Sequence, residues 1–279
     1  MGEASAPSGI KTERFGTMPF KEEKVSVRNG MFNTTVRRSG SGVPLVYMHA
    51  AGPPSWDAVH DLLAEHFEVI QPHHPGWPGS EGFDHLDDVI DMSLYYLDLF
   101  DAMGLRDINL VGTSLGGMFA AEVAALGPQY VSKLVLASPA GLWLDDAMPL
   151  DFFTASQDEL AKAMWYDPEA AAARAPKIDP EDREAQATAT INRQMALSSA
   201  TKFVWPIWDK GLKKRLHRIK APTLLIWGEK DGLNPPVYGP EFQRLIAGSR
   251  LEVIKETAHA PMIEKPEEFA RMVTGFLKG

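Results

Sequence analysis

The chain has 279 residues, of which 44% are hydrophobic and 23% charged, and it carries a formal net charge of −9. This acidic balance disfavours nucleic acid or an anionic membrane as the main partner, and the absence of cysteine excludes disulfides, thiolate catalysis and cysteine metal sites. Residues 1–20 lack the apolar core of a signal peptide, and no stretch approaches a membrane span. We therefore expect a soluble cytoplasmic protein with one domain and a sizeable insertion.

Along the chain, a polar and flexible N-terminal arm at residues 1–20 is followed by segments in which short apolar runs alternate with helical patterns. The expected strands are residues 24–28, 32–38, 43–48, 68–72, 108–111 and 131–136, and the expected helices are residues 56–67, 89–103 and 118–126. Such alternation predicts an α/β fold, with a mostly parallel, doubly wound sheet covered by helices on both faces.

The alternation stops at residue 141 and resumes after residue 210. The intervening residues 141–210 carry no apolar strand pattern; they are helix-prone, acidic and rich in aromatic residues. Further strands are expected at 223–227 and 251–254, and further helices at 240–246 and from Pro266 onwards. We interpret residues 21–140 and 211–279 as one α/β core, into which 141–210 is inserted as a helical lid.

A sharp strand-to-helix turn is predicted around Ser114. The run Gly112-Thr113-Ser114-Leu115-Gly116 matches the G-x-S-x-G nucleophile elbow, with an apolar strand before it and an alanine-rich helix after it. Such a turn exposes the serine oxygen, and the helix amino terminus lends partial positive charge to a developing anion. Ser114 is therefore a candidate nucleophile.

A serine hydroxyl needs a base to take its proton, and the base needs an orienting carboxylate. Asp231 follows the expected strand at 223–227, and His259 follows the expected strand at 251–254. Because the carboxyl ends of neighbouring parallel strands meet at one edge of the sheet, the two side chains are expected side by side. The order Ser114, Asp231, His259 is the Ser-Asp-His order of one hydrolase fold. Rival acids are Glu229 and the pair Asp145-Asp146.

Over residues 24–279 the chain resembles the α/β-hydrolase family. The resemblance rests on the elbow, on Trp227-Gly228-Glu229-Lys230-Asp231, on Ala258-His259-Ala260-Pro261 and on the glycine-rich stretch at residues 75–80. It implies Ser114 as nucleophile, His259 as base and acid, and Asp231 as the orienting anion.

The oxyanion hole needs two backbone donors. The amide of Leu115 is expected to supply one, and the loop His49-Ala50-Ala51-Gly52 the other, through Ala51. Relatives usually carry His-Gly-x-Gly in this loop, so Ala50 replaces a glycine, and alanine resists positive φ. His49 is expected to brace the loop.

A pair of histidines and a basic stretch are expected to have structural roles. Adjacent His73 and His74 would point to opposite faces of an extended segment, so no metal site is expected. The basic stretch at 210–220 carries Leu212, Leu216 and Ile219 at helical spacing, and it predicts an amphipathic helix with a solvated basic face.

The expected function is cofactor-independent hydrolysis of small to medium apolar carboxylic esters through an acyl-enzyme. An apolar pocket is expected, since such sites have few polar groups. Its expected lining is Trp77, Met118, Trp143, Trp165, Trp205 and Met262. Two alternatives stay open: a carbon–carbon bond hydrolase of ring-cleavage diketones, and a small-molecule receptor with little turnover. Relatives of the carbon–carbon type commonly have Asn before the serine and Trp after the histidine, where this chain has Thr113 and Ala260.

Overall fold

The computed structural model describes residues 18–175 and 177–279 of the chain. Its eight strands form one sheet in the order β1-β2-β4-β3-β5-β6-β7-β8. β2 is antiparallel to both of its neighbours, and every pair from β4 to β8 is parallel. The strands are β1 (Lys21–Val27), β2 (Phe32–Ser39), β3 (Pro44–Met48), β4 (Glu68–Pro72), β5 (Ile108–Thr113), β6 (Val131–Ala137), β7 (Thr223–Gly228) and β8 (Arg250–Ile254). The predicted mostly parallel sheet is therefore confirmed.

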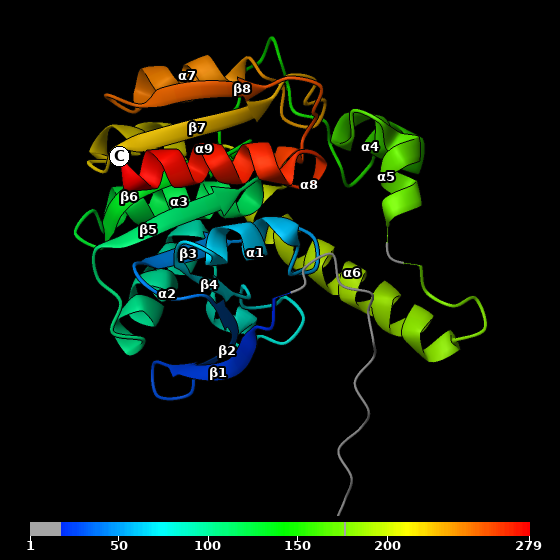
Figure 1. Cartoon of the computed structure of the whole chain (residues 1–279), viewed down its shortest axis with the longest axis horizontal. Coiled ribbons are helices and arrows are strands. Elements are labelled where there is room, and N and C mark those ends of the chain that lie inside the picture. Colours follow the sequence, from blue (N-terminus) through cyan, green and yellow to red (C-terminus); the bar gives the residue numbers. More distant parts are fainter. Residues whose placement is uncertain (1–17, 176) are drawn as a thin grey trace, which may run out of the picture.

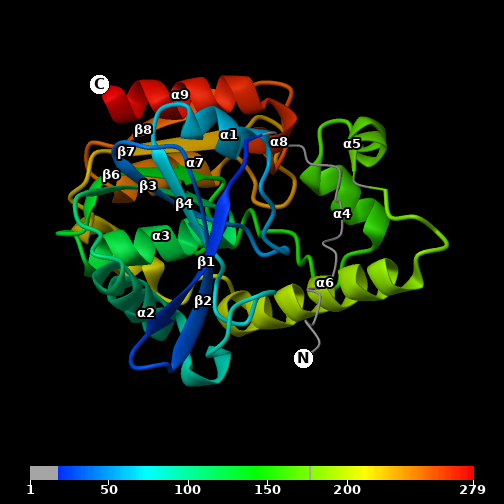
Figure 2. The same cartoon turned by 60° about the horizontal axis from the view of Figure 1, so that its bottom comes forward.

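Helices cover both faces of the sheet (Figures 1 and 2). They pack against the sheet through two apolar cores, one on each face. On one face lie α1 (Ala58–Ala64) and α9 (Pro266–Lys278), and on the other α2 (Val89–Ala102), α3 (Leu115–Leu126) and α7 (Tyr238–Leu245). Alternate residues of a strand enter opposite cores: Leu45 and Tyr47 pack under α1 and α9, while Val46 and Met48 pack on the other side. The central strands β3, β5 and β7 are thus buried on both faces, whereas the edge strands β1 and β8 are partly exposed.

The residues between β6 and β7 form a helical region beside the carboxyl ends of the strands (Figure 1). It contains α4 (Gln157–Met164), α5 (Pro168–Arg174) and α6 (Arg183–Val204). Within residues 141–175 and 177–210 the structure has no strand. None of the helices in the described chain is both long and apolar enough to cross a membrane.

The basic stretch at 210–220 differs from its prediction. Instead of one amphipathic helix it forms two short 3-10 turns, Leu212–Lys214 and Leu216–Arg218. The apolar residues at helical spacing are buried as expected, but the turns are sufficient to bury them. The basic face is also not wholly solvated, because Arg215 donates to both carboxylate oxygens of the buried Glu122 on α3, each at 2.6 Å.

Residues 1–17 of the expected N-terminal arm (residues 1–20) lie outside the described part of the chain. Residues 18–20 are held against the core, contrary to that prediction. The Met18 amide donates to Asp61 Oδ2 at 3.0 Å, and the Phe20 ring lies 5.1 Å from the Trp56 ring. Apolar contacts at Met18 and Phe20 explain why the chain is fixed before β1 begins.

Candidate active site

Ser114 sits at a strained turn between β5 and α3. Its φ of 53° lies in the left-handed region, which costs free energy for a non-glycine residue and is held here by its surroundings. The Ser114 amide donates to Ala137 O at 2.9 Å, and its carbonyl accepts the Ala140 amide at 3.0 Å. Gly116 allows β3 to approach closely, since a Cβ there would lie 2.3 Å from the carbonyl oxygens of Met48 and His49. The predicted elbow is thus formed.

The structure brings Ser114, His259 and Asp231 into one hydrogen-bonded row. His259 Nε2 lies 2.9 Å from Ser114 Oγ, and His259 Nδ1 lies 3.0 and 2.9 Å from the two carboxylate oxygens of Asp231. Asp231 and His259 are buried, and Ser114 is half-buried. Because the Asp231 carboxylate accepts at Nδ1, that nitrogen carries the proton and Nε2 is left to accept from the serine.

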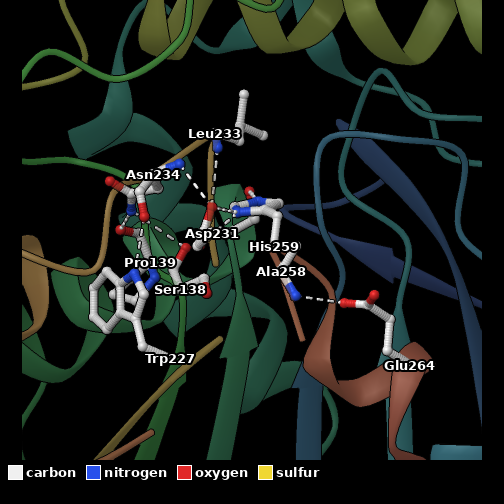
Figure 3. Close-up of polar contacts among 10 residues, drawn as sticks. Ser138, Pro139, Trp227, Asp231, Leu233, Asn234, Ala258, His259 and Glu264 are labelled. Atoms are coloured by element: carbon white, nitrogen blue, oxygen red, sulfur yellow. Dashed lines mark hydrogen bonds and ion pairs between the residues drawn. The ribbon is translucent and has the colours of Figure 1, made fainter. Parts of the chain in front are cut away.

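The Asp231 carboxylate is fixed by its own loop (Figure 3). The amides of Leu233 and Asn234 donate to Oδ1 at 3.1 and 2.8 Å. These bonds supply hydrogen-bond partners to a buried carboxylate and fix its orientation. The rival acids lie elsewhere: Asp145 and Asp146 are exposed, and Glu229 accepts from the Glu256 amide at the surface.

The loop after β3, expected to complete an oxyanion hole, is anchored by hydrogen bonds at His49, Ala50 and Ala51. His49 Nδ1–H donates to Ala50 O at 2.7 Å, and its Nε2 accepts the His74 amide at 3.1 Å. Trp77 Nε1–H donates to Ala51 O at 2.9 Å. The carbonyl and amide of one trans peptide point in opposite directions, so the bond to Ala50 O aims the Ala51 N–H away from His49.

Ala50 does not force the loop into strain. The non-glycine residues with positive φ in the described chain are Arg28, Asn29, Asp107, Ser114, Ser138 and Glu256. Ala50 is outside the left-handed region, so the alanine in place of a glycine is accommodated. Within residues 18–175 and 177–279, no hydrogen bond is formed by the amides of Ala51 and Leu115. Both are therefore free to donate.

Three histidines near this loop are neutral because they are buried. Burial lowers the pKa of His74 to about 3 and, with the nearby Arg37 charge, that of His73 to about 4. Burial also holds the pKa of His49 well below its ordinary value. No group of three or more His, Cys, Asp or Glu in the described residues is arranged to hold a metal ion.

The expected pocket residues are placed unequally. Met118 and Met262 are buried, and Trp143 and Trp165 are half-buried. Trp77 is fully buried, where its indole supports the loop at Ala51. Trp205, at the C-terminal end of α6, is 55% exposed, which argues against a place in a buried pocket.

Two supporting residues escaped the sequence interpretation. The Asn234 side chain donates to Pro139 O, and the Asn234 backbone carbonyl accepts Trp227 Nε1–H at 2.9 Å, so this residue joins the Asp231 loop to the turn after β6 (Figure 3). Glu264 accepts the Ala258 amide, next to His259, at 2.7 Å. No motif marks either residue; only the loop geometry reveals them.

A family profile described as "Alpha/beta hydrolase family" matches residues 45–272. Among curated proteins, the chain is 27% identical over 267 residues to 2-hydroxy-6-oxo-6-(2'-aminophenyl)hexa-2,4-dienoic acid hydrolase of Metapseudomonas resinovorans, covering 90% of this chain and 89% of the relative. It is 29% identical over 265 residues to 2-hydroxymuconate semialdehyde hydrolase of Pseudomonas sp. (strain CF600), covering 88% and 90%.

The fold is also shared with solved structures. The structure of a membrane phospholipase A, described as a bacterial virulence factor, superposes with a TM-score of 0.75. That likeness covers 93% of this chain and 86% of the other at 23% sequence identity.

Proposed function

This chain belongs to the alpha/beta hydrolase family, and from that premise we propose that it is a serine hydrolase that cleaves small to medium apolar carboxylic esters through Ser114, His259 and Asp231. The observation that carries the proposal is the unbroken row of hydrogen bonds from Ser114 Oγ through His259 to Asp231, each between 2.9 and 3.0 Å. In this row the proposed nucleophile is hydrogen-bonded to the proposed base, and the base is hydrogen-bonded to the orienting acid.

In the acylation half, His259 Nε2 takes the Ser114 proton while Ser114 Oγ attacks the ester carbonyl carbon. The amides of Leu115 and Ala51 donate to the negative oxygen of the tetrahedral intermediate. Leu115 is the first residue of α3, so the partial positive charge of the helix N-terminus also stabilises that oxygen. The Asp231 carboxylate stabilises the imidazolium that forms. His259 then protonates the leaving alcohol as the intermediate collapses to the acyl-enzyme.

In the second half, His259 removes a proton from water, and the resulting hydroxide attacks the acyl carbon. Collapse of the new intermediate releases the carboxylic acid and returns the proton to Ser114 Oγ. No step calls for a cofactor. We assign substrate selection to the helical segment 141–210, with Trp143 and Trp165 as its apolar contacts beside Met118 and Met262.

The second candidate is hydrolysis of a carbon–carbon bond in a ring-cleavage product. It is favoured by the names of the two curated relatives, both hydrolases of such dienoic or semialdehyde compounds. There the leaving group is a carbon atom, which must be protonated in place of an alkoxide. Thr113 and Ala260 favour the ester instead, because they stand where carbon–carbon hydrolases of this family commonly have Asn and Trp.

One comparison separates the candidates. Purified protein is assayed against 4-nitrophenyl esters from acetate to decanoate and, in parallel, against 2-hydroxymuconate semialdehyde, with Ser114→Ala as the blank. Turnover of the short and medium esters well above the dienoic substrate supports the esterase. Preference for the semialdehyde supports the second candidate. Absence of turnover in both assays overturns both candidates and points to a receptor.

A further inference from the structure

The C-terminal end of α4 touches both loops that carry the acid and the base. The Gly232 amide, next to Asp231, donates to Ala163 O at 3.0 Å, and the His259 amide donates to Met164 O at 3.1 Å. The last carbonyls of a helix have no partner within the helix, so these two are available for such bonds. Only glycine permits this approach, since a Cβ on Gly232 would lie 2.8 Å from Ala163 Cα.

A single carboxylate also links the histidine loop to the chain that follows α4. Glu264, the last residue of α8 (Pro261–Glu264), accepts the Ala258 amide on Oε2 and the Tyr166 amide on Oε1, both at 2.7 Å. Figure 3 shows Glu264 reaching the backbone immediately before His259. Hydrogen bonds to an ionised carboxylate are short and roughly twice as strong as neutral ones.

We propose that Glu264 is a positioning residue that couples the helical segment 141–210 to the general base. The inference rests on the proposed function, because it gives Glu264 its part through His259. The backbone at Ala258 and His259 is held by two bonds, one from Glu264 and one from Met164. Glu264 also accepts the Tyr166 amide. The links Met164–His259, Ala258–Glu264 and Glu264–Tyr166 therefore close a ring of hydrogen bonds between the end of α4 and the histidine loop.

This ring matters because the imidazole must meet Ser114 and Asp231 at once. Both of its bonds are close to 2.9 Å, so rotation of the histidine loop lengthens at least one of them. A misplacement of about 1 Å at a reacting group can reduce a rate by roughly 100-fold. Through the bonds from Gly232 and His259 to the end of α4, the proposal implies that a shift of α4 moves the loops of acid and base together.

The test compares Glu264→Ala and Glu264→Gln with the control Glu267→Gln, an exposed acid three residues later that makes neither contact. The readout is the rate constant, per folded molecule, at which phenylmethanesulfonyl fluoride labels Ser114. We expect a fall of roughly 10- to 100-fold for Glu264→Ala, a smaller fall for Glu264→Gln, which keeps one carbonyl acceptor, and no change for Glu267→Gln.

The labelling rate per folded molecule separates positioning from mere stabilisation, and amide hydrogen exchange shows whether the change is local. In Glu264→Ala, the Ala258 and Tyr166 amides should lose protection together, while the global unfolding rate changes little. If Glu264→Ala does not fold, Glu264→Gln decides both readouts. Labelling at the wild-type rate in a folded variant, or a loss that only follows the unfolded fraction, overturns the inference. Absence of Ser114 labelling in the wild type overturns the proposed function instead.

Discussion

The Nδ1–H of His259 is shared between both carboxylate oxygens of Asp231, at 3.0 and 2.9 Å, and neither residue is more than 4% exposed. This contact fixes the tautomer of the imidazole and the plane in which it lies. Nε2 is thereby left as an acceptor 2.9 Å from Ser114 Oγ. A general base must be unprotonated at the atom that faces its substrate proton, and this pairing supplies that condition.

The first prediction concerns Asp231→Asn. The amides of Leu233 and Asn234 need an acceptor, so the new side chain will turn its oxygen toward them and its NH₂ toward His259. Nδ1 must then accept, which moves the histidine proton to Nε2. We expect kcat for the best ester to fall by about 10³- to 10⁴-fold with the fold intact by circular dichroism. The control is Glu229→Gln, and a fall below about 10-fold would exclude Asp231 as the orienting acid.

A second prediction concerns the support of the loop at Ala51. Trp77→Phe keeps an aromatic ring but removes the N–H that donates to Ala51 O. Loss of a direct oxyanion donor costs roughly 10²- to 10³-fold in kcat, so loss of a support should cost less, about 10-fold, with KM unchanged. Trp56→Phe is the matched control, since it removes an indole bond to Asp61 in the other core. Equal kcat for both variants would contradict the assignment.

A third prediction concerns acid stability. The pKa of His73 is lowered to about 4 by burial and by Arg37. The His73 imidazole therefore stays neutral in the folded protein down to about pH 4, whereas in the unfolded chain it binds a proton below about pH 6.5. Between these values the unfolded state carries more protons, and stability falls as the pH falls, by about 1.4 kcal/mol per pH unit for this group.

His73→Gln removes that group. Urea unfolding from pH 6 to pH 4.5 should show a shallower decline in the free energy of unfolding, by about 1.4 kcal/mol per pH unit. Identical slopes for variant and wild type would show that His73 is not held neutral by the fold.

Most of the fold could be predicted because its elements carry strong local patterns. Strand β3 is a continuous apolar run, β5 is mostly apolar before the G-x-S-x-G turn, and Pro266 with two glutamates marks the start of α9. The stretch at 210–220 misled because buried residues four and three apart suit one helix or two 3-10 turns equally. The bond from Arg215 to Glu122, 93 residues apart in the chain, is a tertiary contact that the local pattern does not contain.

The residues of the candidate site differ in the same way. Ser114, Asp231 and His259 each follow a strand, and parallel strands bring such positions together, so their meeting could be predicted. The part played by Glu264 depends on two backbone amides from distant segments, which leave no mark on residue type. Trp205 is likewise exposed although Phe203 and Val204 just before it are buried, and periodicity does not encode this change.

The central claim is that Ser114 is the nucleophile, and the most direct measurement is the initial rate of 4-nitrophenyl butyrate hydrolysis by wild-type protein and by Ser114→Ala. The substitution removes only an oxygen at a half-buried turn, so the variant should fold as the wild type does. We predict that its rate falls to that of the enzyme-free blank. A Ser114→Ala rate equal to that of the wild type would contradict the account.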